Sequence, residues 1–173
     1  RSAAVGFFVR TGSRDETTEE SGVSHFLEHM VFKGSRNRDA MQVNKDFDKI
    51  GANYNAFTSE ENTVYYAATL PEYHAQATEI LADILRPSLR SADFDMEKKV
   101  ILEEIGMYED NPGWMVFDHA RREFFGNHPL GNSVLGSVQS ITDLKRDTMV
   151  DYFHKRYVAS NITVVASGNY SWK

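Results

Sequence analysis

The sequence predicts an α+β domain in which helices cover one face of a mainly antiparallel sheet. Segments with helical periodicity outnumber strand-like segments, and the two kinds do not alternate strictly, as they would around a parallel sheet. Two strand-like segments, NYNAFTS and NTVYYAATL, are joined through EEN, which is typical of a hairpin. We find no internal repeat and no linker, and 173 residues suffice for one domain, residues 1–173, with a sizeable core.

The remaining elements follow from local patterns along the chain. Residues 3–9, rich in Ala, Val and Phe, predict a strand, the polar residues 13–21 a loop, and NITVVASG (161–168) a buried strand. We expect helices over residues 22–33, 39–50, 71–85, 93–110, 114–125 and 142–157. Gly51 ends the second of these helices, Pro71 begins the third, and Thr142 caps the last.

Composition excludes several classes of function. The net charge is -6 and there is no run of Lys or Arg, which disfavours nucleic acid and anionic membrane surfaces as partners. No segment approaches the roughly 18 consecutive apolar residues of a membrane span. The absence of cysteine excludes disulfides, thiolate nucleophiles and cysteine-ligated zinc, and is compatible with a cytosolic, periplasmic or mitochondrial protein. Because the chain opens inside a strand-like segment without an initiator methionine, we expect a fragment of a longer protein.

The stretch SHFLEHMVF, residues 24–32, carries three polar side chains within an apolar helix. Its core-facing stripe, at helical spacing, comprises Val23, Phe26, Leu27, Met30 and Val31. At about 100° per residue, His25, Glu28 and His29 cluster on the opposite side. The two histidines lie one helical turn apart, so their nitrogens can bind one cation. The motif H-x-x-E-H is the inverse of H-E-x-x-H, and both place two metal ligands four residues apart with a glutamate beside the metal. An ordinary solvated face is the alternative, and the metal interpretation needs a third ligand.

The helix at residues 93–110 offers that ligand. Glu97 and Glu104 lie seven residues apart and therefore share a face, whereas Glu103 points away, toward Lys99. The apolar members of the shared face, which we expect to be buried, are Phe94, Val100, Ile101 and Tyr108. A buried carboxylate is costly unless it is paired or bound to a metal, so two on one face predict a cation. The alternative is that they stay hydrated at the rim or meet an arginine.

Other patterns indicate no second chemistry. The glycine-punctuated segment GNHPLGNSVLGS lacks the Gly-Lys-Ser/Thr ending of a phosphate loop, and no Ser, His and Asp set has a nucleophile-elbow context. Four histidines lack a partner at ligand spacing and are expected at the surface or in loops: His74, His119, His128 and His154.

With His25-Phe26-Leu27-Glu28-His29 followed by Glu104, the chain resembles the inverzincin zinc peptidases, the family that includes pitrilysin, insulin-degrading enzyme and the mitochondrial processing peptidase. The segments GVSHFLEHMVFKGS, GANYNAFTSEENTVYYA, EKKVILEEI, HPLGNSVLGS and NITVVASGN are similar to that family's segments in the same order. The resemblance covers nearly the whole chain.

The resemblance implies a zinc-dependent endopeptidase with one Zn²⁺ per chain. It implies that His25, His29 and Glu104 hold the metal and that Glu28 is the general base for the attacking water. It further implies that Glu97 supports the site from outside the ligand set and is needed for full activity.

The resemblance also implies partners. Family members bind a peptide substrate as an added strand on a sheet edge, and the segment NAFTS matches that edge, so Asn55, Ala56 and Phe57 are expected to meet the substrate backbone. For Asn55 the alternative is an ordinary turn residue at a strand end. The implied fold is one α+β half of a two-half clamshell, the N-terminal catalytic half, closed by a homologous C-terminal half or a partner subunit.

Two other functions compete with the peptidase. A non-catalytic scaffold or substrate-presenting subunit of the same fold would typically lack ligands or the base, whereas this sequence retains the complete set. A domain whose histidines bind nothing would retain no metal on purification. The complete set favours the peptidase.

Overall fold

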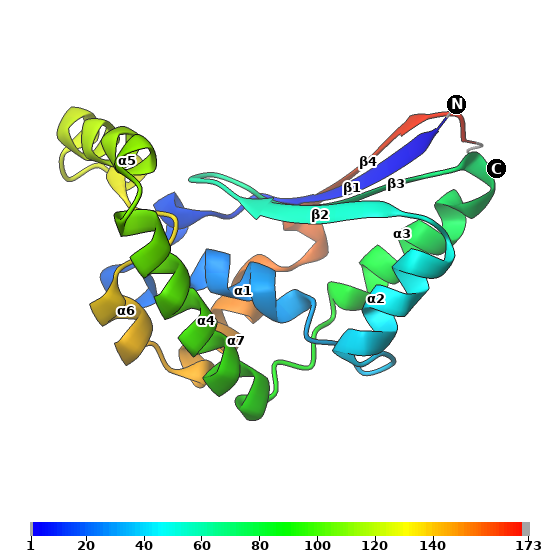
Figure 1. Cartoon of the computed structure of the whole chain (residues 1–173), viewed down its shortest axis with the longest axis horizontal. Helices are drawn as coiled ribbons and strands as arrows, with labels where there is room; N and C mark the ends of the chain where they lie inside the picture. The colour runs from blue at the N-terminus through cyan, green and yellow to red at the C-terminus, as the bar shows by residue number, and fades with distance from the viewer. Residues whose placement is uncertain (1, 171–173) are drawn as a thin grey trace.

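The chain folds as an open sheet with helices beneath it, which confirms the predicted α+β class. The computed structural model describes residues 2–170. The α-helices lie on one face of the sheet, except α5, which projects from one end (Figure 1). The strands are β1 (Ala3–Val9), β2 (Asn53–Thr58), β3 (Thr63–Thr69) and β4 (Ile162–Gly168). The α-helices are α1 (Val23–Val31), α2 (Ala40–Lys49), α3 (His74–Ile84), α4 (Ser91–Glu109), α5 (Pro112–Phe125), α6 (Val138–Asp143) and α7 (Arg146–Arg156). Short 3-10 turns are η1 (Ser13–Asp15), η2 (Thr18–Glu20), η3 (Pro71–Tyr73), η4 (Pro129–Gly131) and η5 (Ala159–Asn161).

The sheet has the strand order β2-β3-β1-β4, and each neighbouring pair is antiparallel. The predicted hairpin is β2 and β3, with Asn53 opposite Ala68 and Thr58 opposite Thr63. Within the described residues β2 therefore lies at one edge of the sheet and β4 at the other. The edge position matters because an edge strand keeps a row of backbone groups free for another strand.

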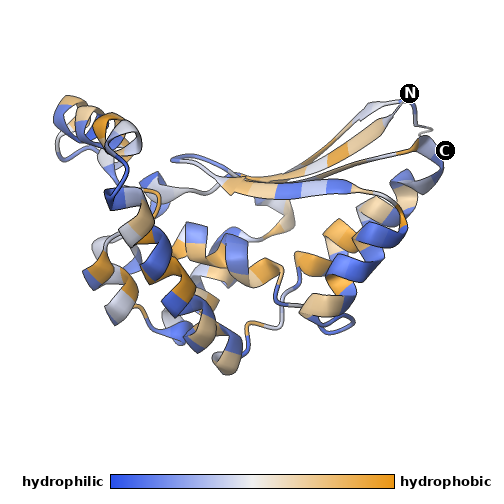
Figure 2. Cartoon of the chain, viewed as in Figure 1, coloured by the Kyte–Doolittle hydropathy of each residue, from blue (hydrophilic) through white to orange (hydrophobic). Residues whose placement is uncertain are grey.

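Two apolar clusters form the core, and α1 joins them. The first cluster lies between the sheet and α2 and α3, and the second lies among α1, α4, α6 and α7. Val31 belongs to the first cluster, whereas Val23, Phe26, Leu27 and Met30 belong to the second. All five predicted core residues of α1 are 0–1% exposed. Figure 2 shows hydrophobic positions, in orange, on the sheet and on the helices beneath it.

The predicted helix over residues 142–157 is present as α7, but its predicted cap at Thr142 is wrong, because α7 begins after Lys145. A separate helix, α6, precedes it, and its N-cap Ser137 accepts a hydrogen bond from the Ser140 amide. Thr142 lies inside α6, where its hydroxyl donates to the Val138 carbonyl. Leu144 then leaves the helical conformation and is buried in the second cluster, so the chain turns before α7 begins.

Two burial predictions are also wrong. NITVVASG forms β4, but this strand is at an edge, and Val164 and Val165 are 51% and 47% exposed. A short apolar run does not by itself distinguish a central strand from an edge strand. Val100 is exposed although Ile101 is buried, because successive residues of a helix point about 100° apart. His119, His128 and His154 are exposed as expected, and His74 is half-buried with its ring beside the Pro71 carbonyl.

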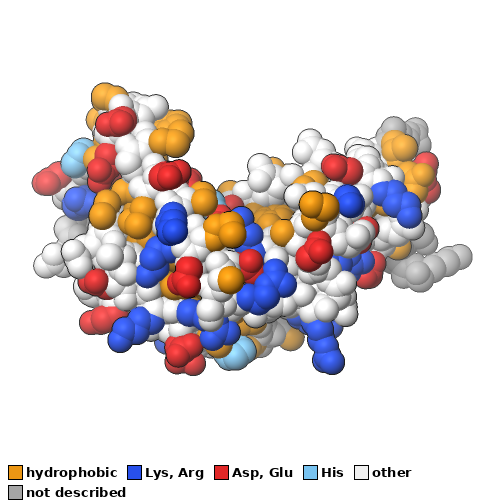
Figure 3. All heavy atoms as spheres, turned by 60° about the horizontal axis from the view of Figure 1, so that its bottom comes forward, with side chains coloured by type: hydrophobic (Ala, Val, Ile, Leu, Met, Phe, Trp, Pro, Cys, Tyr) orange, Lys and Arg blue, Asp and Glu red, His pale blue; other side chains and the backbone are white. Residues whose placement is uncertain are grey.

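The helical face of the molecule carries acidic and basic side chains interspersed with one another (Figure 3). Among the described helices, none combines the length and apolar character that a membrane crossing requires.

Gly22, the N-cap of α1, is predicted to tolerate no side chain. Its φ is +89°, and an added Cβ would lie 2.7 Å from both the Ile141 Cδ1 atom and the Leu135 carbonyl oxygen. Gly51 is a matched control, because its φ of +59° is also left-handed but nothing lies within 4 Å of an added Cβ. Both alanine variants should lose about 1–2 kcal/mol to the backbone conformation. Gly22→Ala should lose about 1–3 kcal/mol more through overpacking. Equal urea-unfolding free energies for the two variants would contradict this packing.

Candidate active site

The polar face of α1 is covered rather than solvated. His25 is buried at 7% exposed, and Glu28 and His29 are half-buried. The two imidazole rings lie one helical turn apart with their centroids 4.7 Å from each other. Because the opposite side of α1 is locked into both core clusters, this face is held toward β2 and α4.

Glu104 of α4 meets both histidines. Its Oε1 lies 3.6 Å from His25 Nε2, and its Oε2 lies 3.5 Å from His29 Nε2. One ligand atom from each of the three residues lies within 4.8 Å of the others, and no other such group of three occurs among the described residues. These separations are too long for good hydrogen bonds but suit ligands of one ion at about 2.0–2.2 Å from each. Two imidazole nitrogens, a carboxylate and an open fourth position fit catalytic zinc.

Glu97 holds the second histidine from behind. His29 Nδ1 lies 2.8 Å from Glu97 Oε1, and the Lys33 ammonium lies 2.5 Å from Oε2. Burial raises the pKa of Glu97, but its contacts with His29 and Lys33 outweigh this and keep the pKa below its ordinary value. The ionised carboxylate then accepts the Nδ1 proton and leaves the lone pair on Nε2, the atom that faces Glu104.

His25 has a different environment. Burial, and then the charge of His29, lowers the pKa of His25 to about 3, so the ring is neutral at pH 7 and its Nε2 lone pair is available. Its other nitrogen, Nδ1, is buried and has no hydrogen-bond partner among the described residues. Unlike His29, this ring is therefore not oriented by a polar side chain.

Glu28 lies beside the three candidate ligands and is held by the edge strand. The Thr58 hydroxyl donates a 2.7 Å hydrogen bond to Glu28 Oε2. Burial raises the pKa of Glu28, although this hydrogen bond opposes the shift. The arrangement keeps one carboxylate oxygen engaged and places a readily protonated acid at the candidate metal position.

A cleft of about 440 Å³ opens at this point. Its lining includes His25, Glu28, Glu104 and the β2 residues Ala56 and Phe57. Asn55, Ala56 and Phe57 all lie on the edge strand β2, and of these three Ala56 and Phe57 line the cleft. The Phe57 side chain is 49% exposed, and the Asn55 side-chain oxygen accepts the Ala56 amide proton. A contact of these residues with a peptide stays a prediction.

Sequence reasoning missed two residues close to the site. The position of Thr58 could have been predicted, because residues two apart on a strand share a side, and Thr58 lies on the same side of β2 as Ala56, facing the helices. Lys33 also had a signal, since it follows His29 by four residues and can share its side of the chain.

Helix α5 supplies a third group that no sequence signal indicated. Phe117, Asp118 and Arg121 line the same cleft. Arg121 pairs with Asp118 on its own helix and with Glu60 in the hairpin turn, which ties the projecting helix to the end of β2. Only the folded chain brings these residues together.

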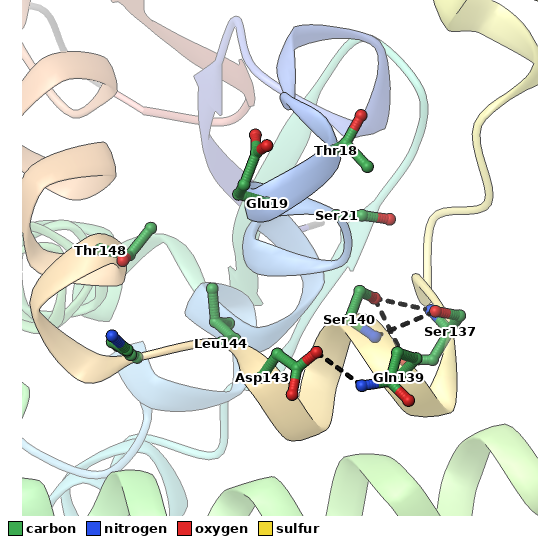
Figure 4. Close-up of a pocket in the computed structure, with 10 residues that line it drawn as sticks. Thr18, Glu19, Ser21, Ser137, Gln139, Ser140, Asp143, Leu144 and Thr148 are labelled. Atoms are coloured by element: carbon green, nitrogen blue, oxygen red, sulfur yellow. Dashed lines mark hydrogen bonds between the residues drawn. The ribbon is translucent and has the colours of Figure 1, made fainter.

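A second hollow, of about 570 Å³, lies between η2, α6 and the start of α7 (Figure 4). Its polar groups are partly satisfied by one another, since Ser137 is hydrogen-bonded to Ser140 and Gln139 donates to Asp143. No histidine lines it. Among the described residues, the one convergent group of candidate metal ligands lies instead on α1 and α4.

Comparison with known proteins agrees with this geometry. The model of the insulinase family, peptidase family M16, matches residues 1–138. The chain is 41% identical to the uncharacterized zinc protease YmxG of Bacillus subtilis over 99% of its length and 42% of that protein's. It is 38% identical to the beta subunit of the mitochondrial-processing peptidase of Saccharomyces cerevisiae, over 96% of this chain and 36% of the relative.

The fold comparison gives the same result. A crystal structure of a protease from Helicobacter pylori superposes with a TM-score of 0.94 at 24% identity, covering 99% of this chain and 42% of that one. At this identity the likeness shows the fold alone. The chain spans about two fifths of the length of the curated relatives named here. The match to the family model over residues 1–138 shows that the chain belongs to the insulinase family, peptidase family M16.

Proposed function

We propose that this chain is the metal-binding half of a zinc-dependent endopeptidase. The observation that carries the proposal is the convergence of His25, His29 and Glu104 beside a hydrogen-bonded, half-buried Glu28. A scaffold subunit needs neither three convergent ligands nor a base, so the complete set favours catalysis.

In this proposal His25, His29 and Glu104 hold one Zn²⁺. A bound zinc ion lowers the pKa of a water molecule to about 7 and so makes it a nucleophile at neutral pH. Glu97 keeps His29 in the tautomer that exposes Nε2 and is a positioning residue. The three ligands come from two helices that share the second core cluster, so the core sets their spacing.

Glu28 is the general base. Its pKa, raised by burial, favours accepting a proton from the attacking water, and the same carboxylic acid can then protonate the leaving amine. Thr58 engages Oε2 and leaves the other oxygen for the proton transfer.

The substrate is a peptide that pairs with the edge of β2. Backbone hydrogen bonds to residues 55–57 would place the scissile bond next to Glu28, because Thr58, the last residue of β2, is hydrogen-bonded to the Glu28 carboxylate. A homologous second half, on the same chain or on a partner, would close the cleft. The greater length of the relatives supports this part of the proposal.

Zinc binding should depend on the ligand set and not on acidic residues nearby. The purified chain is expected to bind about one zinc. His25→Ala, His29→Ala and Glu104→Gln should each weaken binding by more than the roughly 10- to 100-fold that loss of an outer partner costs. Glu103→Gln is the matched control, since Glu103 is exposed on the other side of α4. Chelator competition measures the affinity, and equal losses in the Glu103 and Glu104 variants would contradict the assignment.

Glu28→Gln should separate binding from catalysis in the full-length protein. The amide keeps the shape of the side chain but cannot accept a proton from water at neutral pH. Zinc content and peptide affinity should stay unchanged, while the cleavage rate falls by at least about 10²–10⁴-fold. Cleavage at a near-native rate would show that another group is the base.

The chain of 173 residues should by itself be a poor peptidase even when loaded with zinc. The candidate ligands and base lie within it, but catalysis also needs water exclusion, a fixed substrate and donors for the developing oxyanion. Loss of one such donor alone costs about 10²–10³-fold in rate. The measurement is peptide cleavage with and without the remainder of the full-length protein added in trans. Full activity of the isolated chain would contradict the two-half arrangement.

A further inference from the structure

The first turn of α1 is held by a carboxylate from outside the helix. Glu16 follows η1 in sequence and is buried. Its Oε2 accepts a 2.7 Å hydrogen bond from the Gly22 amide, and its Oε1 accepts a 2.8 Å bond from the Ser24 amide. A helix leaves its first four amide groups without partners, and this one side chain satisfies two of them.

Helix α1 has no cap of its own. Its N-cap is Gly22, which has no side chain to accept a hydrogen bond, and its first turn contains no acidic residue. The packing of Ile141 and Leu135 against Gly22 leaves no space for a serine or aspartate there. Glu16 supplies the missing acceptor and, in its ionised form, a negative charge at the positive end of the helix dipole.

The same turn is tied down a second time. The Ser24 hydroxyl is hydrogen-bonded to the Tyr152 hydroxyl at 2.9 Å, and Tyr152 is hydrogen-bonded to the Thr11 hydroxyl at 2.7 Å. All three groups are buried. Burial raises the pKa of Glu16 to about 7, although the Ser24 and Gly22 amides oppose the shift, which is consistent with a carboxylate placed deep in the protein.

This turn carries His25, and His25 is the candidate ligand without support of its own. His29 is oriented by Glu97, whereas His25 Nδ1 has no hydrogen-bond partner among the described residues. A metal ligand must be held to within about 0.5 Å of its productive position. For His25 that precision has to come from the backbone, and Ser24, the residue before it, donates its amide directly to Glu16.

We propose that Glu16 is a positioning residue for the candidate metal centre, because it holds the first turn of α1 and through it the His25 ring. The inference rests on the proposed zinc site. Glu97 orients the His29 ring directly, whereas Glu16 would orient the His25 ring through the backbone of α1.

The test compares Glu16→Ala and Glu16→Gln with Asp39→Ala in the 173-residue chain. Asp39 is the control, because its carboxylate likewise accepts a hydrogen bond from a backbone amide, that of Gln42, at the start of a helix. That helix, α2, packs in the first core cluster, whereas the candidate metal ligands lie on helices of the second. Three readouts are needed: urea unfolding of the metal-free protein, zinc affinity by chelator competition, and the visible absorption of the cobalt(II) form, which reports ligand geometry.

All three variants should lower the urea midpoint, but only the Glu16 variants should change the metal readouts. Glu16→Ala should weaken zinc about tenfold or more and alter the cobalt spectrum. Glu16→Gln keeps one acceptor oxygen for one backbone amide and places an NH₂ group beside the other. Its loss of zinc affinity should therefore be smaller than that of Glu16→Ala. This variant decides the matter if the alanine variant does not fold.

Two results would overturn the inference, and they are distinguishable. Native zinc affinity and a native cobalt spectrum in a folded Glu16 variant would refute it and leave the proposed function intact. Failure of the unaltered chain to bind zinc would refute the proposed function, and the inference with it.

Discussion

Helix α1 is buried along one side by two separate apolar clusters, and this constraint orients the three α1 groups of the candidate site, His25, Glu28 and His29. Val31 packs toward the sheet, while Phe26 and Met30 pack toward α4 and α7. Rotating α1 would expose residues that are now fully buried, at about 25 cal/mol for each Å² of apolar surface. The polar face therefore has one available direction, toward α4 and the edge of the sheet. Ordinary core packing thus sets the geometry of the histidines.

Charges at both ends of α1 follow the helix dipole. The carboxylate of Glu16 lies at the N-terminal end, and the ammonium of Lys33 lies just beyond the C-terminal end, where it also meets Glu97. Each arrangement is favourable for a helix, which carries partial positive charge at its start and partial negative charge at its end. Buried carboxylates are costly when unpaired, so Glu16 and Glu97 stay buried only because backbone amides, an imidazole and an ammonium surround them.

Much of this site is visible in the sequence because its spacings are helical. The histidines are four positions apart and Glu97 and Glu104 are seven apart, spacings that predict shared faces, and the structure brings those faces together. The contribution of α5 was not predictable, because Arg121 reaches Glu60 only through the fold. Helix α6 was not predicted, and α7 begins after Lys145 rather than at Thr142, because Leu144 leaves the helical conformation and is buried in the second cluster. The exposure of β4 depends on strand order, which local patterns do not encode.

The edge strand β2 and the candidate base Glu28 are joined directly by a hydrogen bond. Thr58 is the last residue of β2, pairs with Thr63 across the hairpin, and donates its hydroxyl proton to Glu28. A peptide added to this edge would therefore be aligned by the same backbone ladder that orients the base. Strand pairing reads backbone groups rather than side chains, so the alignment would be similar for many peptide sequences. Selectivity among peptides would then have to come from groups outside the ladder, and the α5 residues lining the cleft are placed to contribute to it.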